Sequence, residues 1–305
     1  MTPQKTLTGR AWAELLLLSA IWGGSFLSVR LALNEIGPLT TVAHRVFWGA
    51  LILWLVIAAR RLPLPRDPRI WVGFLVMGAL NNVIPFTLLT WGQLHIETGL
   101  TSILNSTTAI FGILVAAAVF ADERLTIRRL IGVTLGFCGV AIAIGPEALM
   151  RFDLRSIAQL AVLGATLSYA FAGAWARARL SSLSPLVAAA GMLTASALFM
   201  VPMAWITEGA FRFDLSLVTW GSIAYIAGAA TAVAYLLYYR VLAMAGSGNL
   251  MLCTLLIPPI AIVLGAAVLG EALMPQAYGG FVLLALGMVV LDGRALAALR
   301  GKKFF

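Results

Sequence analysis

The sequence predicts an all-α integral membrane protein, with ten transmembrane helices arranged as two inverted five-helix repeats around a central cavity. Three observations support this prediction. Of the 305 residues, 61% are hydrophobic and only 11% are charged, whereas soluble domains carry about 25% charged residues. The apolar residues form long runs separated by short polar segments. The second half of the chain also repeats the first half at a nearly constant offset, which indicates an internal duplication.

Charge and cysteine usage narrow the class of protein further. The formal net charge is +9, but the basic residues lie in short clusters between apolar runs. That pattern is typical of a membrane protein anchored by its cytoplasmic loops and does not indicate a nucleic-acid partner. Cys138 and Cys253 lie inside apolar runs and are interpreted as small packing residues, not as a disulfide or metal site. Two histidines leave no zinc ligand set, so neither a metal nor a cofactor is expected.

A helix needs roughly 20 apolar residues to span a bilayer. Ten runs of about this length are predicted as spans, at residues 11–33, 40–59, 70–91, 100–120, 130–144, 157–175, 185–206, 217–241, 249–270 and 277–291. The first run has a long apolar core, and no small-x-small cleavage pattern follows it. It is therefore predicted to be an uncleaved first span and not a signal peptide.

Lysine and arginine are distributed very unequally between the loops on the two sides of the membrane. One set of loops carries Lys5, Arg10, Arg60, Arg61, Arg66, Arg69, Arg124, Arg128, Arg129, Arg177, Arg179, Arg240, Arg294, Arg300, Lys302 and Lys303. The other set carries only Arg30, Arg151, Arg155 and Arg212. Because cytoplasmic loops hold the excess of positive charge, both termini are predicted to be cytoplasmic.

The duplication is clearest where residues 259–293 are aligned on residues 111–145, at an offset of 148. The matched pairs are Val115/Val263, Ala118/Ala266, Glu123/Glu271, Leu125/Leu273, Gly132/Gly280, Leu135/Leu283, Gly139/Gly287 and Gly145/Gly293. Earlier in the chain, Trp22 pairs with Tyr169 and Pro38 with Pro185 at an offset of 147. The chain is therefore divided into a first repeat at residues 1–148 and a second at residues 149–305.

Each repeat contains five spans, and because five is odd the second repeat enters the membrane upside down. Glu123 is then expected in a cytoplasmic turn and Glu271 in an outward-facing one. Inverted repeats are a device of secondary transporters, since exchange of the two halves' conformations converts an inward-open state into an outward-open one. Some channels also have inverted repeats, so the pattern favours transport more strongly than it favours a carrier over a pore.

Together, these features resemble the drug/metabolite transporter superfamily, and within it the bacterial EamA-type exporters, a group that includes amino-acid exporters. The resemblance covers essentially the whole chain. It rests on the ten spans in two halves, the glutamate after spans four and nine, and the glycines along spans five and ten. Trp22-Gly23-Gly24-Ser25-Phe26 in span one and Arg45 in span two also resemble that family's opening pattern.

The resemblance implies export of a small metabolite from a central cavity lined by spans one, three, four and six and their later counterparts. It further implies a multi-pass protein of the bacterial cytoplasmic (inner) membrane. The implied partners are a small-molecule substrate and the lipid bilayer, with the protein acting as a monomer or homodimer.

Arg45 lies about seven residues inside span two, roughly 10 Å along the helix. An unpaired arginine at such depth costs on the order of 2–3 kcal/mol or more and is presumed functional. No carboxylate lies at a comparable depth in the outer half, since Glu14 is near the opposite face. Arg45 either attracts a substrate carboxylate, or it snorkels outward or caps helix carbonyls to hold a gate. Met192 at the equivalent position favours the second reading, because it shows that the other half needs no charge there.

Two polar segments interrupt the apolar runs of spans three and four. Asn81 and Asn82 precede Pro85, which frees the carbonyl of Asn81 from the helical ladder. These amides are predicted either to line a cavity or to form hydrogen bonds between helices. Asn105 and Thr107 belong to the polar run at residues 105–108, for which cavity lining is favoured.

Deep aromatic residues and prolines complete the candidate site. Trp22, Tyr169, Tyr235 and Tyr238 are candidates for an aromatic cavity wall, with ordinary packing as an equal alternative. Pro258 and Pro259 are expected to break the helical ladder of span nine near mid-membrane and, with Pro85, to form a hinge or gate. A static kink is the alternative.

The leading interpretation is a secondary transporter that exports small metabolites, above all amino acids, by alternating access. Because no acidic residue is predicted at mid-membrane, the lining permits uniport. The sequence contains no P-loop, HExxH motif or paired intramembrane aspartates, so an enzyme is not expected. Export of cationic drugs or other metabolites, a channel and a non-transporting membrane protein remain as alternatives.

Overall fold

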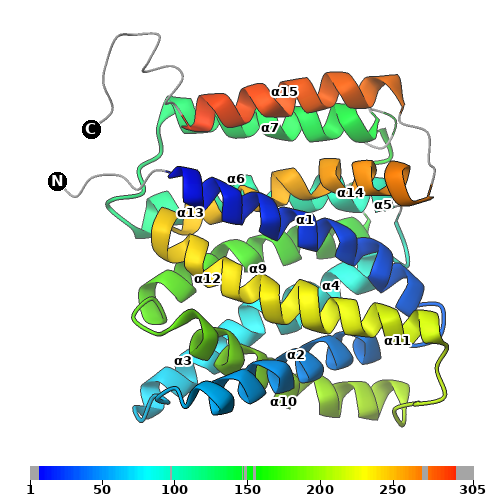
Figure 1. Cartoon of the computed structure of the whole chain (residues 1–305). Helices are drawn as coiled ribbons and strands as arrows, with labels where there is room; N and C mark the ends of the chain where they lie inside the picture. The colour runs from blue at the N-terminus through cyan, green and yellow to red at the C-terminus, as the bar shows by residue number, and fades with distance from the viewer. Residues whose placement is uncertain are drawn as a thin grey trace.

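The structure is a computed structural model that describes residues 7–96, 98–145, 147, 150–153, 156–269 and 274–292. Within these ranges the regular secondary structure is entirely helical, and the helices lie side by side as one bundle (Figure 1). Eight helices are long and apolar enough to cross a membrane, and two shorter apolar helices follow at Ser247–Val263 and Pro275–Leu291. The predicted ten-helix fold is thereby confirmed.

The first repeat contains α1 (Gly9–Ala32), α2 (Pro38–Arg60), α3 (Pro68–Gly78), the π-helical η1 (Ala79–Val83), α4 (Ile84–Gly92), α5 (Thr98–Ser106), α6 (Thr108–Val119) and α7 (Ile127–Ile144). The second contains α9 (Ile157–Arg179), α10 (Pro185–Glu208), α11 (Leu217–Ala224), the π-helical η2 (Tyr225–Val233), α12 (Ala234–Ala245), α13 (Ser247–Leu250), α14 (Cys253–Leu269) and α15 (Pro275–Asp292). Spans three and eight therefore each contain a π-helical segment, at similar positions in the two repeats.

Local sequence explains where several helices begin. Thr126, Ser156 and Ser216 each accept a hydrogen bond from a backbone N–H of the first helical turn, which satisfies a donor that has no partner within the helix. Pro38 and Pro185 occupy first helical positions, where a missing N–H costs nothing. These signals fix the start of each helix, and burial of its apolar residues supplies most of its stability.

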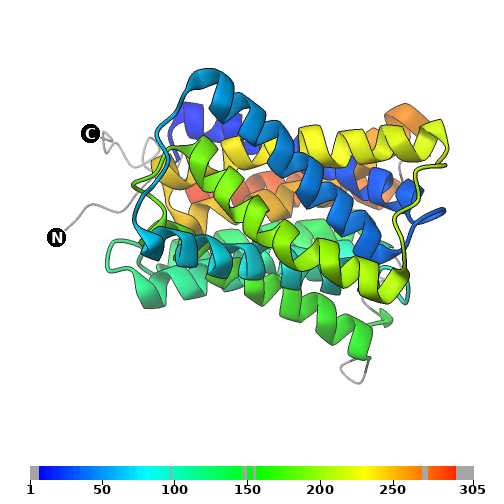
Figure 2. The same ribbon diagram turned by 90° about the horizontal axis from the view of Figure 1, so that it is seen from below.

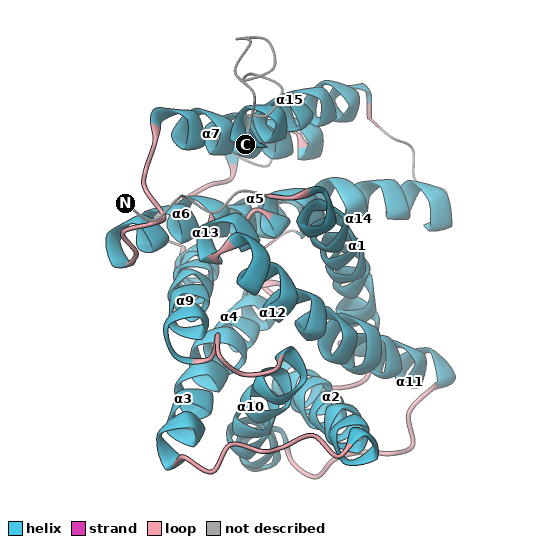
Figure 3. Ribbon diagram, turned by 60° about the vertical axis from the view of Figure 1, so that its left-hand side comes forward, coloured by secondary structure: helices cyan, strands magenta, loops and turns pink. Residues whose placement is uncertain are grey.

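Helices α7 and α15 form a pair at one edge of the bundle, and α2 and α10 form a pair at the opposite edge (Figure 3). Glycines allow α7 and α15 to approach closely. A Cβ added to Gly139 would lie 2.7 Å from the carbonyl oxygen of Gly280, and one added to Gly287 would lie 2.7 Å from that of Gly132. Along α7 from Gly132 to Gly139, the contacted residue of α15 changes from Gly287 to Gly280. The two helices are therefore antiparallel. Because Gly132/Gly280 and Gly139/Gly287 are repeat equivalents, the crossing has the symmetry expected of an inverted repeat.

Helices α2 and α10 also run side by side in opposite directions (Figure 2, blue and yellow-green). At one end, Glu208 accepts a hydrogen bond from the Leu39 backbone N–H at 2.9 Å. Toward the other end, the Trp54 indole donates to Thr194 Oγ1 at 2.7 Å. The pair therefore connects the same span of the two repeats in antiparallel fashion.

The break expected at Pro258 and Pro259 is absent, because α14 continues through both prolines. The interruption lies earlier, at Met251 and Leu252 between α13 and α14. Pro258 deprives the Thr254 carbonyl of its helical donor, and Ser106 Oγ donates to that carbonyl at 3.2 Å instead. Span four thus compensates for the proline in span nine. The proposed role of the prolines as a hinge stays a prediction.

Parts of the sequence-based description fall on residues that the structure does not describe. Glu271 and the neighbouring residues 270, 272 and 273 lie outside the described residues, as do residues 1–6 and 293–305 at the termini. The boundary between residues 148 and 149 lies there too, so the exact division of the repeats stays a prediction.

Candidate functional site

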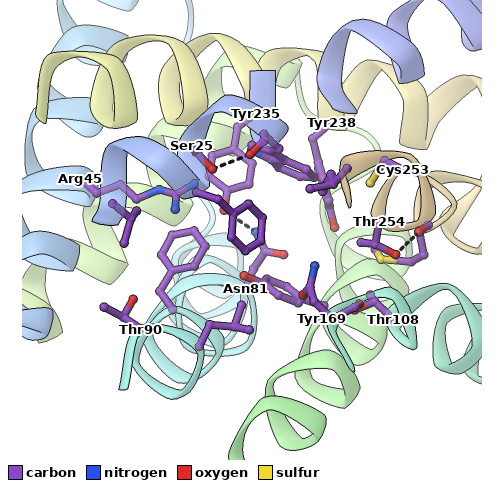
Figure 4. Close-up of a pocket in the computed structure, with 18 of the residues that line it drawn as sticks. Ser25, Arg45, Asn81, Thr90, Thr108, Tyr169, Tyr235, Tyr238, Cys253 and Thr254 are labelled. Carbon is purple, nitrogen blue, oxygen red and sulfur yellow. Dashed lines mark hydrogen bonds between the residues drawn. The ribbon is translucent and has the colours of Figure 1, made fainter. Parts of the chain in front are cut away.

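A cavity lies inside the bundle, among α1, α2, η1, α4, α5, α6, α9, α12 and α14 (Figure 4). These elements belong to spans one, three, four and six and their counterparts, together with span two. The cavity measures about 90 Å³, several times the roughly 10–15 Å³ that a single water molecule requires. Its lining reaches Val29 and Gln93, near the ends of α1 and α4, so it extends away from the end of the bundle at which α1 begins.

Arg45 lines the cavity and is held by the π-helical η2. Its Nε donates to Thr231 Oγ1 at 2.9 Å and its Nη2 donates to the Ala230 carbonyl at 3.1 Å. Its guanidinium carbon lies 4.0 Å from the centre of the Phe86 ring. Among the described lining residues none is an aspartate or glutamate. The geometry therefore shows Arg45 capping a helix carbonyl at the edge of the cavity, and its role toward a substrate carboxylate stays a prediction.

Trp22 is fixed by the same carbonyl as Arg45. Its Nε1 donates to Ala230 O at 3.0 Å. Its ring lies edge-on to Tyr235 at a centroid distance of 6.2 Å and tilted to Tyr238 at 6.4 Å. These three aromatic residues form a contiguous wall whose edge-to-face geometry is favourable.

Tyr235 joins η1 to α12 through two asparagines. Its hydroxyl donates to Asn82 Oδ1 and accepts from Asn81 Nδ2 at 3.0 Å. Asn81 lines the cavity, whereas Asn82 points to α10 and donates to Ser196 Oγ at 2.8 Å. Of the two predicted amides, one therefore faces the cavity and the other holds helices together from behind. Pro85, the second residue of α4, is buried and does not line the cavity.

On the opposite wall, Tyr169 lines the cavity and lies edge-on to Phe86 at 6.4 Å. Thr107 does not line it, because its hydroxyl donates to the Leu104 carbonyl at 2.6 Å and lies 3.1 Å from Thr166 Oγ1. Its neighbour Thr108 faces the cavity in its place. The structure thus brings together Trp22, Arg45, Asn81, Asn105, Tyr169, Tyr235 and Tyr238, and leaves Asn82, Thr107 and the prolines outside the lining.

Several residues at helical spacing line the cavity although they were not predicted to do so. Ser25 and Val29 continue the face of Trp22 along α1, and Phe86 and Thr90 share one face of α4 with its C-terminal cap residue Gln93. Positions separated by three, four and seven residues lie on the same side of a helix. That spacing, extended from Trp22, is the signal that identifies the α1 set.

Two cavity atoms have no hydrogen-bond partner among the described residues. They are Oδ1 of Asn105 and the hydroxyl of Tyr238. Both residues line the cavity and are almost fully buried, with 4% and 2% of their surface exposed. Buried polar groups are normally hydrogen-bonded, so these two atoms lack the partner that such groups usually have.

At the end of the bundle where α1 begins, ion pairs connect the helices. Glu123 accepts from the backbone N–H groups of Ser247 at 2.8 Å and Gly248 at 2.9 Å, and it pairs with Arg177. Glu14 of α1 pairs with Arg240 of α12. These contacts join segments of both repeats at this end.

At the other end, an exposed contact links the α1–α2 turn to α11. Glu35 accepts from the Ser216 N–H at 3.0 Å and from its hydroxyl. The hydroxyl hydrogen bond, reinforced by the backbone one, lowers the pKa of Glu35 below its ordinary value. Within the neighbouring loop, Arg212 pairs with Asp214 at 3.0 Å, and this bond lowers the pKa of Asp214. Such exposed contacts add little stability.

The fold and the site can now be compared with known proteins. A chain in a solved crystal structure has the same fold, with a TM-score of 0.80 over 96% of this chain and 99% of that chain, at 15% sequence identity. The model of the EamA-like transporter family matches residues 10–145 and again residues 156–291. The chain belongs to the EamA-like transporter family. The resemblance inferred from the sequence is confirmed, and the double match agrees with the two repeats.

Relatives of this EamA-like transporter include proteins named as exporters. A "Probable terminal-alkyne amino-acid exporter" of Streptantibioticus cattleyicolor is 26% identical over 96% of this chain and 97% of that protein. A "Probable amino-acid metabolite efflux pump" of Salmonella typhimurium is 26% identical over 90% of this chain and 92% of its own length. The chain is therefore a multi-pass membrane protein of a transporter family.

Proposed function

We propose that this EamA-like transporter exports amino acids across the bacterial cytoplasmic membrane by alternating access. The observation that carries the proposal is the charge of the cavity. Arg45 lies in a lining that contains no carboxylate among the described residues, and it is already held in place by η2. A preorganised guanidinium binds a carboxylate through charge-assisted hydrogen bonds. The names of the relatives support the same substrate class.

The charge of the cavity also separates the alternatives. A cationic drug would bring a second positive charge next to Arg45 in a region of low dielectric constant, and like charges repel strongly there. A substrate with a carboxylate is favoured instead. Export of other carboxylate-bearing metabolites is the nearest alternative within transport.

The direction of access follows from the predicted topology. If both termini are cytoplasmic, the ion pairs of Glu123 and Glu14 lie at the cytoplasmic end and the cavity extends outward. The structure then corresponds to an outward-facing state. Breaking these pairs while the outer ends close completes alternating access, because inverted repeats can exchange conformations.

The first test is uptake of a panel of radiolabelled amino acids into proteoliposomes, for the native protein and Arg45→Gln. Native uptake is expected to be saturable, and the variant should raise KM roughly tenfold or more, since a hydrogen bond to a charged group contributes about 1.5–3 kcal/mol. Arg66→Gln removes the same charge from an exposed loop and serves as the matched control.

Each outcome of this assay has a defined meaning. Absence of uptake for every amino acid overturns the proposed substrate class. An unchanged KM in Arg45→Gln shows that Arg45 does not bind the substrate and that its role is structural, as a carbonyl cap. Flux that rises in proportion to concentration, without trans-stimulation, indicates a channel. Uniport predicts uptake without an imposed proton gradient, and a strict requirement for such a gradient contradicts it.

A further inference from the structure

We propose that Asn105 and Tyr238 form a second polar subsite, which binds a neutral hydrogen-bonding group at the tip of the substrate's side chain. The inference rests on the proposed function, because it takes the substrate carboxylate to lie at Arg45. It adds a specificity determinant at the other side of the cavity. The ligand class is an amino acid whose side chain ends in a primary amide or hydroxyl.

The position of the subsite follows from the arrangement of the lining. Figure 4 shows Arg45 at one side of the cavity and Tyr238, Thr108 and Thr254 at the other, with Tyr235 and Tyr169 between them. Asn105 belongs to this second side, since its backbone carbonyl accepts from the Thr108 hydroxyl at 2.7 Å. A substrate carboxylate held by Arg45 therefore directs its side chain along the aromatic wall toward Asn105 and Tyr238.

The two unpartnered atoms, Asn105 Oδ1 and the Tyr238 hydroxyl, are complementary to one kind of group. Asn105 Oδ1 is an acceptor without a donor, and the Tyr238 hydroxyl can both donate and accept. A primary amide carries both complements, an N–H that donates to Asn105 Oδ1 and a carbonyl that accepts from Tyr238. A hydroxyl group satisfies them in the same way.

Several polar groups beside them on the wall are already engaged. Tyr235 and Asn81 are hydrogen-bonded to each other, and Tyr235 also bonds Asn82. Trp22 donates to Ala230 O. The Tyr238 hydroxyl and Asn105 Oδ1, by contrast, have no partner among the described residues. An apolar side chain leaves both atoms buried and unpaired, which is unfavourable. The cavity therefore discriminates against an apolar tip of the same length.

Glutamine and methionine test this discrimination, because their side chains are similar in length and differ in the polarity of the tip. Competitive uptake of the two into proteoliposomes measures their ratio of kcat/KM. The native protein is expected to favour glutamine. Asn105→Leu should reduce the glutamine-to-methionine ratio about tenfold, and Tyr238→Phe, which removes only the hydroxyl, should reduce it several-fold.

Asn34→Leu is the matched control, since Asn34 is exposed in the turn after α1, and it should leave the ratio at the native value. The proposed subsite is wrong if the native glutamine-to-methionine ratio is near one, or if the ratio is unchanged in both Asn105→Leu and Tyr238→Phe. Either result indicates that only water binds the two atoms. These results leave amino-acid export standing. Absence of uptake for all amino acids overturns the proposed function, and the subsite with it.

Discussion

Replacement of Glu123 by alanine is expected to lower the free energy of unfolding by about 3–5 kcal/mol, because it removes the carboxylate from a buried ionic cluster. The Glu123 side chain is fully buried. It pairs with Arg177 and lies 4.0 Å from Nη1 of Arg129, which is itself almost fully buried. Without Glu123, Arg129 loses its nearest carboxylate, although Asn249 Oδ1 still accepts from its Nη2 at 3.2 Å.

The same substitution also removes acceptors from the backbone. Glu123 accepts from the Ser247 N–H, the Ser247 hydroxyl and the Gly248 N–H, all at the start of α13. The chain reaches this position through Gly246, whose φ of +84° lies in the region that favours glycine. Loss of Glu123 therefore leaves the donors at the start of α13 unsatisfied, in addition to removing the carboxylate beside Arg129. It also removes the ion pair that connects the loop after α6 to α9.

Thermal unfolding of the purified protein in detergent measures this effect. Glu123→Ala should unfold at a clearly lower temperature than the native protein, and Glu123→Gln should fall between them because it keeps one acceptor and loses the charge. Glu147→Ala removes an exposed glutamate and should change the unfolding temperature little. Equal unfolding temperatures for Glu123→Ala and Glu147→Ala would show that the cluster adds no stability.

The glutamate illustrates what sequence patterns can and cannot provide. Glu123 was identified by its match to Glu271 at a fixed offset, and its turn was placed after span four. Its partners Arg177 and Ser247 lie in the other repeat, far along the chain, and no spacing rule connects them. Long apolar runs and the offset were sufficient for the fold, because both reflect requirements of the bilayer and of the duplication, and neither depends on details of packing.

The cavity lining was harder to predict, because a lipid-facing helix has no polar outer stripe that fixes its rotation. Asn81 and Asn82 are adjacent, yet one faces the cavity and the other faces α10. Thr107 and Thr108 divide in the same way. The π-helical turn in η1 adds to the difficulty, because it shifts the angular position of the residues that follow it, and the sequence carries no clear signal for it.

The prolines of span nine show the same dependence on tertiary contacts. A proline removes a helical hydrogen bond wherever it stands, and this loss led to the expected break. The helix stays continuous because Ser106 of another span satisfies the Thr254 carbonyl. Whether a proline bends a membrane helix thus depends on a neighbour that local sequence does not reveal.

Replacement of Gly280 by leucine is expected to separate α7 from α15 and to destabilise the protein by about 1–3 kcal/mol or more, as overpacking of a filled interface does. A Cβ at Gly280 would lie within 3.0 Å of the Gly139 carbonyl oxygen and the Ala143 backbone nitrogen. Both contacts are with backbone atoms, which cannot rotate away as a side chain can. Small residues at such crossings allow membrane helices to pack closely, so the substitution forces the two helices apart.

Gly279 provides the matched control for this prediction. It is the preceding residue of the same helix, and a Cβ there would meet nothing within 4 Å. Gly279→Leu should therefore keep or slightly raise the unfolding temperature in detergent, because leucine has a higher helix propensity than glycine. Gly280→Leu should lower it, and Gly139→Leu should act in the same direction from the opposite helix, since its Cβ would meet the backbone of Leu284 and Gly280. If Gly279→Leu and Gly280→Leu unfold at the same temperature, the close crossing of α7 and α15 does not hold the two repeats together, and the symmetric interface has to be sought at α2 and α10.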